Sequence, residues 1–148
     1  MFTRILVPLD GSKRAEMILP YVEELATCVE ATVILVEVVE PIPVILDAHD
    51  SVIAMQMEDM KEREQEARTY LTAQVGEFRS RGIQSRMRIM HGSVAEAICV
   101  QAEADNIDLI AMASHGRGGL GQVVYGSVAS AVLHKSHTPL LLIRASDS

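Results

Sequence analysis

Short apolar runs recur along the chain and are separated by longer segments with helical periodicity. The runs at residues 5–7, 32–39, 107–113 and 140–143 are almost continuously apolar, as in strands that are buried on both faces of a parallel sheet. Residues 83–90 instead alternate apolar and polar side chains, which predicts an edge strand with one exposed face. The pattern therefore predicts five strands.

Between these strands, apolar residues recur at the spacing of one helical face. The helices predicted in this way cover residues 12–29, 55–81, 93–104 and 121–137. Ser12 is expected to cap the first helix and Pro20 to kink it. Ser93 and Glu96 are expected to form a capping box at the start of the third. Met55, Met57 and Met60 are interpreted as packing residues.

The alternation of strands and helices predicts an α/β fold. Right-handed crossovers turn this order into an open, mostly parallel five-stranded sheet with helices on both faces, a Rossmann-like arrangement. Residues 1–148 are expected to form a single domain, since no repeat or second domain is evident. Residues 41–54 are unusually apolar for a loop and are expected to fold over a neighbouring surface or a partner.

Composition and charge limit the cellular compartment and the classes of binding partner that are expected. The 148 residues carry 13 Lys and Arg against 20 Asp and Glu, a net charge of -7 that would repel nucleic acid over most of the surface. No signal peptide and no apolar run of membrane-spanning length is evident, so a cytoplasmic protein without membrane insertion is expected. Cys28 and Cys99 lack metal-ligand spacing and are interpreted as buried free thiols.

A glycine-rich loop follows the fourth predicted strand. Residues 114–121 contain four glycines and lead through Gly126 and Ser127 into the last helix. Backbone N–H groups at such a helix N-terminus favour an anion, so a phosphate is the expected ligand. The loop lacks the Gly-Lys-Ser/Thr of a P-loop, and no dinucleotide fingerprint follows the first strand.

Residues 113–127 also resemble the Gly-x2-Gly-x9-Gly-Ser/Thr motif of ATP-binding universal stress proteins. The pattern here is Ala113 to Gly116, nine further residues, and then Gly126-Ser127. Residues 5–12 resemble the opening of that family, residues 36–39 its second strand and residues 139–143 its last strand. The resemblance covers nearly the whole chain and implies a fold similar to the adenine nucleotide alpha hydrolases.

The resemblance also implies which residues contact an adenine nucleotide. The residues placed near adenine and ribose are Pro8, Leu9, Asp10, Val38, Met112 and Ala113, and those placed near the phosphates are Gly116, Gly126, Ser127 and Val128. Their chemistry agrees with these roles, because Asp10 offers an acceptor, Ser127 a hydroxyl and Val38 an apolar wall. Asp10 is equally explained as a turn residue. His115 and Arg117 are interpreted either as phosphate contacts or as solvated loop positions.

Ala113 departs from the family motif, in which this position is glycine. The added methyl group restricts positive φ, so either the backbone is extended there or nucleotide contact is impaired. No metal site and no catalytic machinery is predicted. The leading hypothesis is a homodimeric sensor or regulator that binds ATP, with Mg²⁺ as a potential companion, or AMP or a cyclic nucleotide, and signals to an unknown protein partner.

The family usually dimerises through its last strand, here Leu140, Leu141, Leu142 and Ile143. Unpaired, these residues would leave an apolar sheet edge exposed. Two alternatives to the sensor remain open. One is a dimeric interaction protein that has lost nucleotide binding, and the other is a slow ATPase.

Overall fold

The structure, a computed structural model, describes residues 1–43, 47, 49–115 and 126–145. Its elements are β1 (Arg4–Pro8), α1 (Lys13–Glu16), α2 (Leu19–Val29), β2 (Thr32–Val39), α3 (Asp50–Ser80), β3 (Ser85–His91), α4 (Val94–Ala104), β4 (Leu109–His115), α5 (Ser127–Lys135) and β5 (Leu140–Ala145). The described strands are all parallel and lie in the order β3-β2-β1-β4-β5. The predicted α/β fold with a five-stranded parallel sheet is confirmed.

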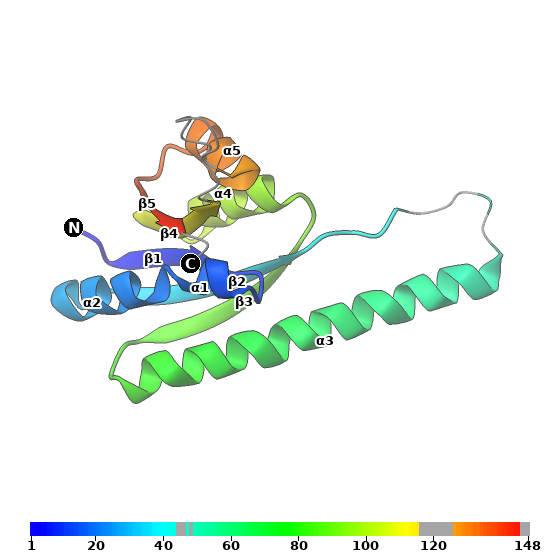
Figure 1. The fold of residues 1–148 in the computed structure, drawn as a ribbon, viewed down its shortest axis with the longest axis horizontal. Helices are drawn as coiled ribbons and strands as arrows, with labels where there is room; N and C mark the ends of the chain where they lie inside the picture. The colour runs from blue at the N-terminus through cyan, green and yellow to red at the C-terminus, as the bar shows by residue number, and fades with distance from the viewer. Residues whose placement is uncertain (44–46, 48, 116–125, 146–148) are drawn as a thin grey trace.

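Helices cover both faces of this sheet, as Figure 1 shows. Side chains alternate between the faces, so Ile5 and Val7 of β1 pack against α2 and α3, whereas Leu6 packs against α4 and α5. All three are fully buried. The continuous apolar runs in the sequence therefore correspond to strands that contribute to two separate halves of the core.

The first predicted helix is divided into α1 and α2. Ser12 caps α1 as expected, because its Oγ accepts a hydrogen bond from the N–H of Ala15 at 3.1 Å. Pro20 does not kink a continuous helix but lies in the first turn of α2. That turn suits proline, since its missing N–H would have no intrahelical partner there.

The helix α3 is longer than predicted and begins at Asp50, within the segment expected to be irregular. All its buried residues lie in its carboxyl half, from Ala67 to Phe78. Its amino half extends away from the sheet (Figure 1). The packing predicted for Met55 and Met57 is wrong, because their exposed fractions are 72% and 60%. Residues 44–46 and 48 lie outside the described part, so the docking expected of residues 41–54 stays a prediction.

The remaining elements differ from prediction mainly at their ends. The strand β3 lies at a sheet edge as expected, and β4 is shifted by two residues toward the carboxyl terminus. Ser93 is the N-cap of α4, but its side chain makes no capping hydrogen bond, so the predicted capping box is wrong. Cys28 is exposed rather than buried, and Cys99 is half-buried. None of the described helices has both the length and the apolar character needed to cross a membrane.

Candidate functional site

The candidate site lies at the carboxyl ends of β1 and β4. These neighbouring parallel strands are where the chain order in the sheet reverses, since β2 and β3 extend to one side of β1 and β5 lies beyond β4 (Figure 1). Crevices in open α/β sheets form at such switch points. A turn rather than a direct helix follows β1.

A cavity of about 130 Å³ opens at this switch point. Its walls come from β1, α1, α4, β4 and the start of α5. The residues that line it are Pro8, Leu9, Asp10, Ala15, Val94, Ile98, Met112, Ala113, Ser114, Gly126, Ser127, Val128 and Ala129. Eight of the residues singled out in the sequence are among them. Gly116 and Arg117 lie outside the described residues, as does most of the glycine-rich loop.

Asp10 forms the turn that connects β1 to α1. Its Oδ1 accepts a hydrogen bond from the backbone N–H of Ser12 at 2.9 Å, and Gly11 between them has a φ of +81°. This is an Asx turn, and Gly11 at its centre adopts the left-handed conformation that glycine tolerates without steric cost. The turn interpretation of Asp10 is therefore confirmed. Because the residue is also exposed and lines the cavity, the same turn presents its carboxylate to a ligand.

Ala113 lies within β4 and pairs with Ile143 of β5. Among the described residues other than glycine, only Glu30 and Asn106 have positive φ. The backbone at Ala113 is therefore extended, which is the first of the two possibilities raised by the missing glycine. Its methyl group packs beside the core cluster on the α2 side of the sheet, so alanine is accommodated here without backbone strain.

The N-terminus of α5 points its unpaired N–H groups at the cavity. Gly126 is the buried N-cap, and neither its neighbours nor any other described side chain caps the helix. The N–H groups in the first turn have no intrahelical partner, and they lie at the positive end of the helix dipole. Ser127 adds an exposed hydroxyl at the same position. This end of α5 can therefore hold an anion.

Val38 lines a second cavity, of about 410 Å³, between the end of β2 and the middle of α3. Asp10 lies in the wall of both cavities. The second cavity is otherwise lined by Gly11, Glu37, Val39, Glu40, Arg63, Glu66, Ala67 and Tyr70. Asp10 and Val38 of this cavity were predicted as site residues from the sequence, but its glutamates were not, because Glu37 is only an interruption in an apolar strand there.

The acidic side chains of this second cavity affect each other's protonation. Burial raises the pKa of the Glu37 carboxyl, and the charges of Asp10 and Glu66 raise it further. Burial also raises the pKa of the Tyr70 hydroxyl, which donates a hydrogen bond to Glu16 Oε1 at 3.0 Å. Within the described residues, no group of three or more His, Cys, Asp and Glu side chains is placed to hold a metal ion.

The cavity residues that sequence reasoning missed are mainly apolar. Ile98 and Val94 belong to the face of α4 that packs on the sheet, and Ala15 belongs to α1. In this fold the sheet-packing face of α4 borders the switch-point cavity. The periodicity of α4 was therefore the signal that could have identified Ile98 and Val94.

Comparison with known proteins agrees with this architecture. Residues 1–144 match the Universal stress protein family. Universal stress protein MJ0577 of Methanocaldococcus jannaschii is 28% identical over 159 aligned residues, which cover 100% of this chain and 98% of that protein. The solved structure of MJ0577 superposes with a TM-score of 0.83 and 29% identity, covering 100% of this chain and 99% of that one.

Two more distant solved structures share the fold and contain nucleotides. A universal stress protein in complex with cAMP has a TM-score of 0.63 and 18% identity, and covers 98% of each chain. A universal stress family protein of Arabidopsis thaliana with AMP bound has a TM-score of 0.64 and 13% identity, and covers 98% of this chain and 93% of that one. From the match over residues 1–144, we conclude that this chain belongs to the universal stress protein family.

Proposed function

We propose that this protein binds an adenine nucleotide, with ATP as the main ligand, at the switch point between β1 and β4. The observation that carries the proposal is the gathering of Pro8, Asp10, Met112 and Ser127, far apart in the sequence, around one cavity at the N-terminus of α5. Related proteins in complex with cAMP and with AMP support the same ligand class.

The chemistry of the lining residues fits the parts of a nucleotide. The first turn of α5 and the Ser127 hydroxyl would hold phosphate oxygens, because they offer donors at the positive end of a helix. The carboxylate of Asp10 would accept from a ribose hydroxyl or the adenine amine. Met112 and Val38 supply apolar contacts. When ATP is bound, Mg²⁺ would neutralise part of the phosphate charge.

The two cavities together accommodate such a ligand better than either alone. The 130 Å³ cavity is smaller than the roughly 300–1,000 Å³ typical of small-molecule sites. It therefore matches one part of a nucleotide, namely the phosphates and the sugar. The neighbouring 410 Å³ cavity shares Asp10 and includes Val38, so it adds room for the base.

The site supports binding more than catalysis. Among the described residues that line the 130 Å³ cavity, where the phosphates are placed, Asp10 is the one carboxylate, and one of its oxygens accepts a hydrogen bond from the N–H of Ser12. An efficient phosphoryl-transfer site needs positioned cations and a group that orients the nucleophile. We therefore propose a sensor or regulator whose bound nucleotide changes the surface that a protein partner contacts.

The test is to identify any nucleotide that the purified protein releases on denaturation, and then to titrate ATP, AMP and cAMP by calorimetry. We expect Gly126→Val to weaken ATP binding at least tenfold, because a branched side chain at the buried N-cap would displace the phosphates. Gly76→Val is the matched control, since a Cβ at this exposed glycine of α3 meets nothing within 4 Å.

Three outcomes distinguish the proposals. Binding that Gly126→Val removes and Gly76→Val retains supports the sensor. No released nucleotide and no heat of binding would contradict it and favour a dimeric interaction protein. Rapid ATP turnover with Mg²⁺ that disappears in Gly126→Val would show an enzyme instead.

A further inference from the structure

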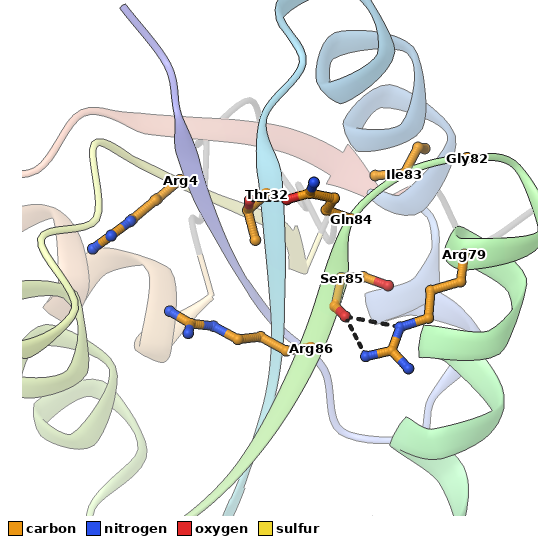
Figure 2. Close-up of a pocket in the computed structure, with 8 residues that line it drawn as sticks. All are labelled: Arg4, Thr32, Arg79, Gly82, Ile83, Gln84, Ser85 and Arg86. Carbon is orange, nitrogen blue, oxygen red and sulfur yellow. Dashed lines mark hydrogen bonds between the residues drawn. The ribbon is translucent and has the colours of Figure 1, made fainter.

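The amino ends of β1, β2 and β3 border a third cavity, of about 620 Å³, at the opposite edge of the sheet from the candidate nucleotide site. Figure 2 shows the side chains that line it. They are Arg4, Thr32, Arg79, Gly82, Ile83, Gln84, Ser85 and Arg86. Three of these eight are arginines, although the chain as a whole has a net charge of -7. The volume lies within the range of about 300–1,000 Å³ common for small-molecule sites.

Two of the arginines converge on Asp105, the C-cap residue of α4. Arg4 donates a hydrogen bond from Nη1 to the Asp105 carbonyl oxygen at 2.6 Å. The Arg86 guanidinium approaches the Asp105 carboxylate at 3.9 Å, which is beyond hydrogen-bond distance. In Figure 2 both side chains extend to the same side of β2. They therefore place two positive charges close to one another.

The Asp105 carboxylate is already engaged by a third arginine. Arg88 donates from Nε to Oδ2 at 2.9 Å and from Nη2 to Oδ1 at 3.1 Å, a bidentate pair. Burial opposes ionisation of Asp105, but hydrogen bonds from Gln101 and Arg88 and the charges of Arg88 and Arg86 hold the pKa of this carboxyl below its usual value. The Asp105 carboxylate thus faces two guanidinium groups, those of Arg88 and Arg86, and its hydrogen bonds from arginine come from Arg88, which does not line the cavity.

The cavity arginines keep unused hydrogen-bond donors. Arg79 donates from Nε and Nη2 to the Ser85 carbonyl oxygen at 3.1 and 2.9 Å, which leaves its Nη1 (Figure 2). Within the described residues, the Arg86 guanidinium donates no hydrogen bond. Its side chain is 46% exposed, so its donors are accessible to a ligand. A guanidinium carries five N–H donors in a planar fork that matches phosphate and carboxylate oxygens. Gln84 and Thr32 add polar groups to the same wall, where the Thr32 hydroxyl donates to Gln84 Oε1 at 3.3 Å.

We propose that this arginine-lined cavity at the amino ends of the strands is a second ligand site, which binds a small multivalent oxyanion bearing phosphate or carboxylate groups. The occupant would pair with Arg86 and Arg4 on one side and with the remaining donors of Arg79 on the other. This inference does not depend on nucleotide binding at the switch point, because no residue is shared between the two sites.

The experiment titrates inorganic pyrophosphate and, separately, citrate into the full chain by calorimetry, and locates the binding by amide NMR. We expect the amide signals of Thr32, Gln84 and Ser85 to shift. Arg86→Gln should weaken binding about tenfold or more, which corresponds to the loss of a charge-assisted hydrogen bond. Rising salt should weaken it as well. Binding of pyrophosphate but not citrate, or of citrate but not pyrophosphate, would show which class of oxyanion the site binds.

Arg68→Gln is the matched control, because it removes the same charge from an exposed position on α3 that does not line the cavity. It should bind as the wild type does. Because Arg86 makes no hydrogen bond within the described residues, its substitution is expected to leave the fold intact, which circular dichroism checks. Equal binding by Arg86→Gln and wild type, shifts confined to Ser127 and Val128, or no saturable binding at millimolar concentrations would each overturn the proposal.

Discussion

Glu37 carries a carboxyl group on the face of β2 that is covered by α3. Its neighbours Leu35, Val36 and Val39 are buried, and its Oε2 atom is buried as well, with no hydrogen-bond partner among the described residues. Burial is the main reason why the pKa of this carboxyl lies above its ordinary value of 4.5, and the nearby charges of Asp10 and Glu66 add to the effect. The ionised form of Glu37 is therefore disfavoured in the folded protein.

This shift makes the free energy of unfolding depend on pH. Between the ordinary and the raised pKa, the folded state binds more protons than the unfolded state, so stability present below that window is lost as pH rises through it. We expect Glu37→Gln to remove this loss, so that the variant becomes more stable than wild type as pH rises toward neutrality. Urea unfolding from pH 4 to 8 measures this difference in the free energy of unfolding between variant and wild type. Glu62→Gln, at an exposed position, is the control. Wild type and Glu37→Gln profiles that run parallel would contradict the interpretation.

Asp108 connects two elements at the amino end of the sheet. Its Oδ2 accepts hydrogen bonds from the backbone N–H and the hydroxyl of Thr3, each at 2.8 Å, and its Oδ1 accepts from the N–H of Arg4 at 3.1 Å. These bonds join the residue before β4 to the start of β1. Burial opposes ionisation, but the bonds from Thr3 and Arg4 hold the pKa of Asp108 below its usual value.

Asp108→Ala should therefore destabilise the β1–β4 pair. The loss of these bonds in a partly exposed setting is expected to cost about 1 kcal/mol in the free energy of unfolding. Because the pKa is lowered, the stabilisation exists above the ordinary value and is lost as pH falls through the lowered one. The difference from wild type should thus shrink in acid. Urea unfolding at several pH values tests this, with exposed Asp59→Ala as the control, and a difference that grows in acid would refute it.

Sequence patterns located the elements better than their ends. A strand buried on both faces is continuously apolar, and a strand buried on one face alternates apolar and polar residues. All five strands were therefore predicted, including the edge position of β3. The start of α3 was missed because residues 50–54 lie away from the core, and no apolar stripe marks a helical turn that packs on nothing. The exposure of Met55 and Met57 has the same cause. Pro20 was predicted to kink a continuous helix, but it lies in the first turn of α2. The sequence does not distinguish these cases, since proline can interrupt a helix or begin one.

At the scale of the whole molecule, the sequence predicted those residues of the candidate site that belong to a recognisable motif or lie near the end of a predicted strand. Asp10 follows β1, Met112 lies within β4 and Ser127 begins α5, and the topology brings these positions together at the switch point. The acidic cavity around Glu37 and the arginine-lined cavity could not be predicted. Their members come from strands and helices whose relative register the sequence does not state, so Arg4, Arg79 and Arg86 read as unrelated surface charges.

The two edges of the sheet differ in a way that bears on assembly. The strand β3 exposes Arg86 and Arg88, and charged side chains at an edge discourage pairing with another strand. The strand β5 instead carries the apolar residues Leu140, Leu141, Leu142 and Ile143, all half-buried. An apolar edge strand with no charge before Arg144 is suited to pairing with a second copy of itself. We therefore expect a homodimer formed through β5.

Light scattering on the purified chain tests this expectation, and a dimer mass at micromolar concentration is predicted. Leu142→Lys should shift the mass toward the monomer, because pairing would bury an ammonium group without a partner. Leu133→Lys is the control, since this leucine of α5 is 52% exposed and lies outside the edge strand. A monomeric wild type would contradict the dimer. A dimer that withstands Leu142→Lys but not Leu133→Lys would place the interface on α5, so that β5 remained an unpaired edge.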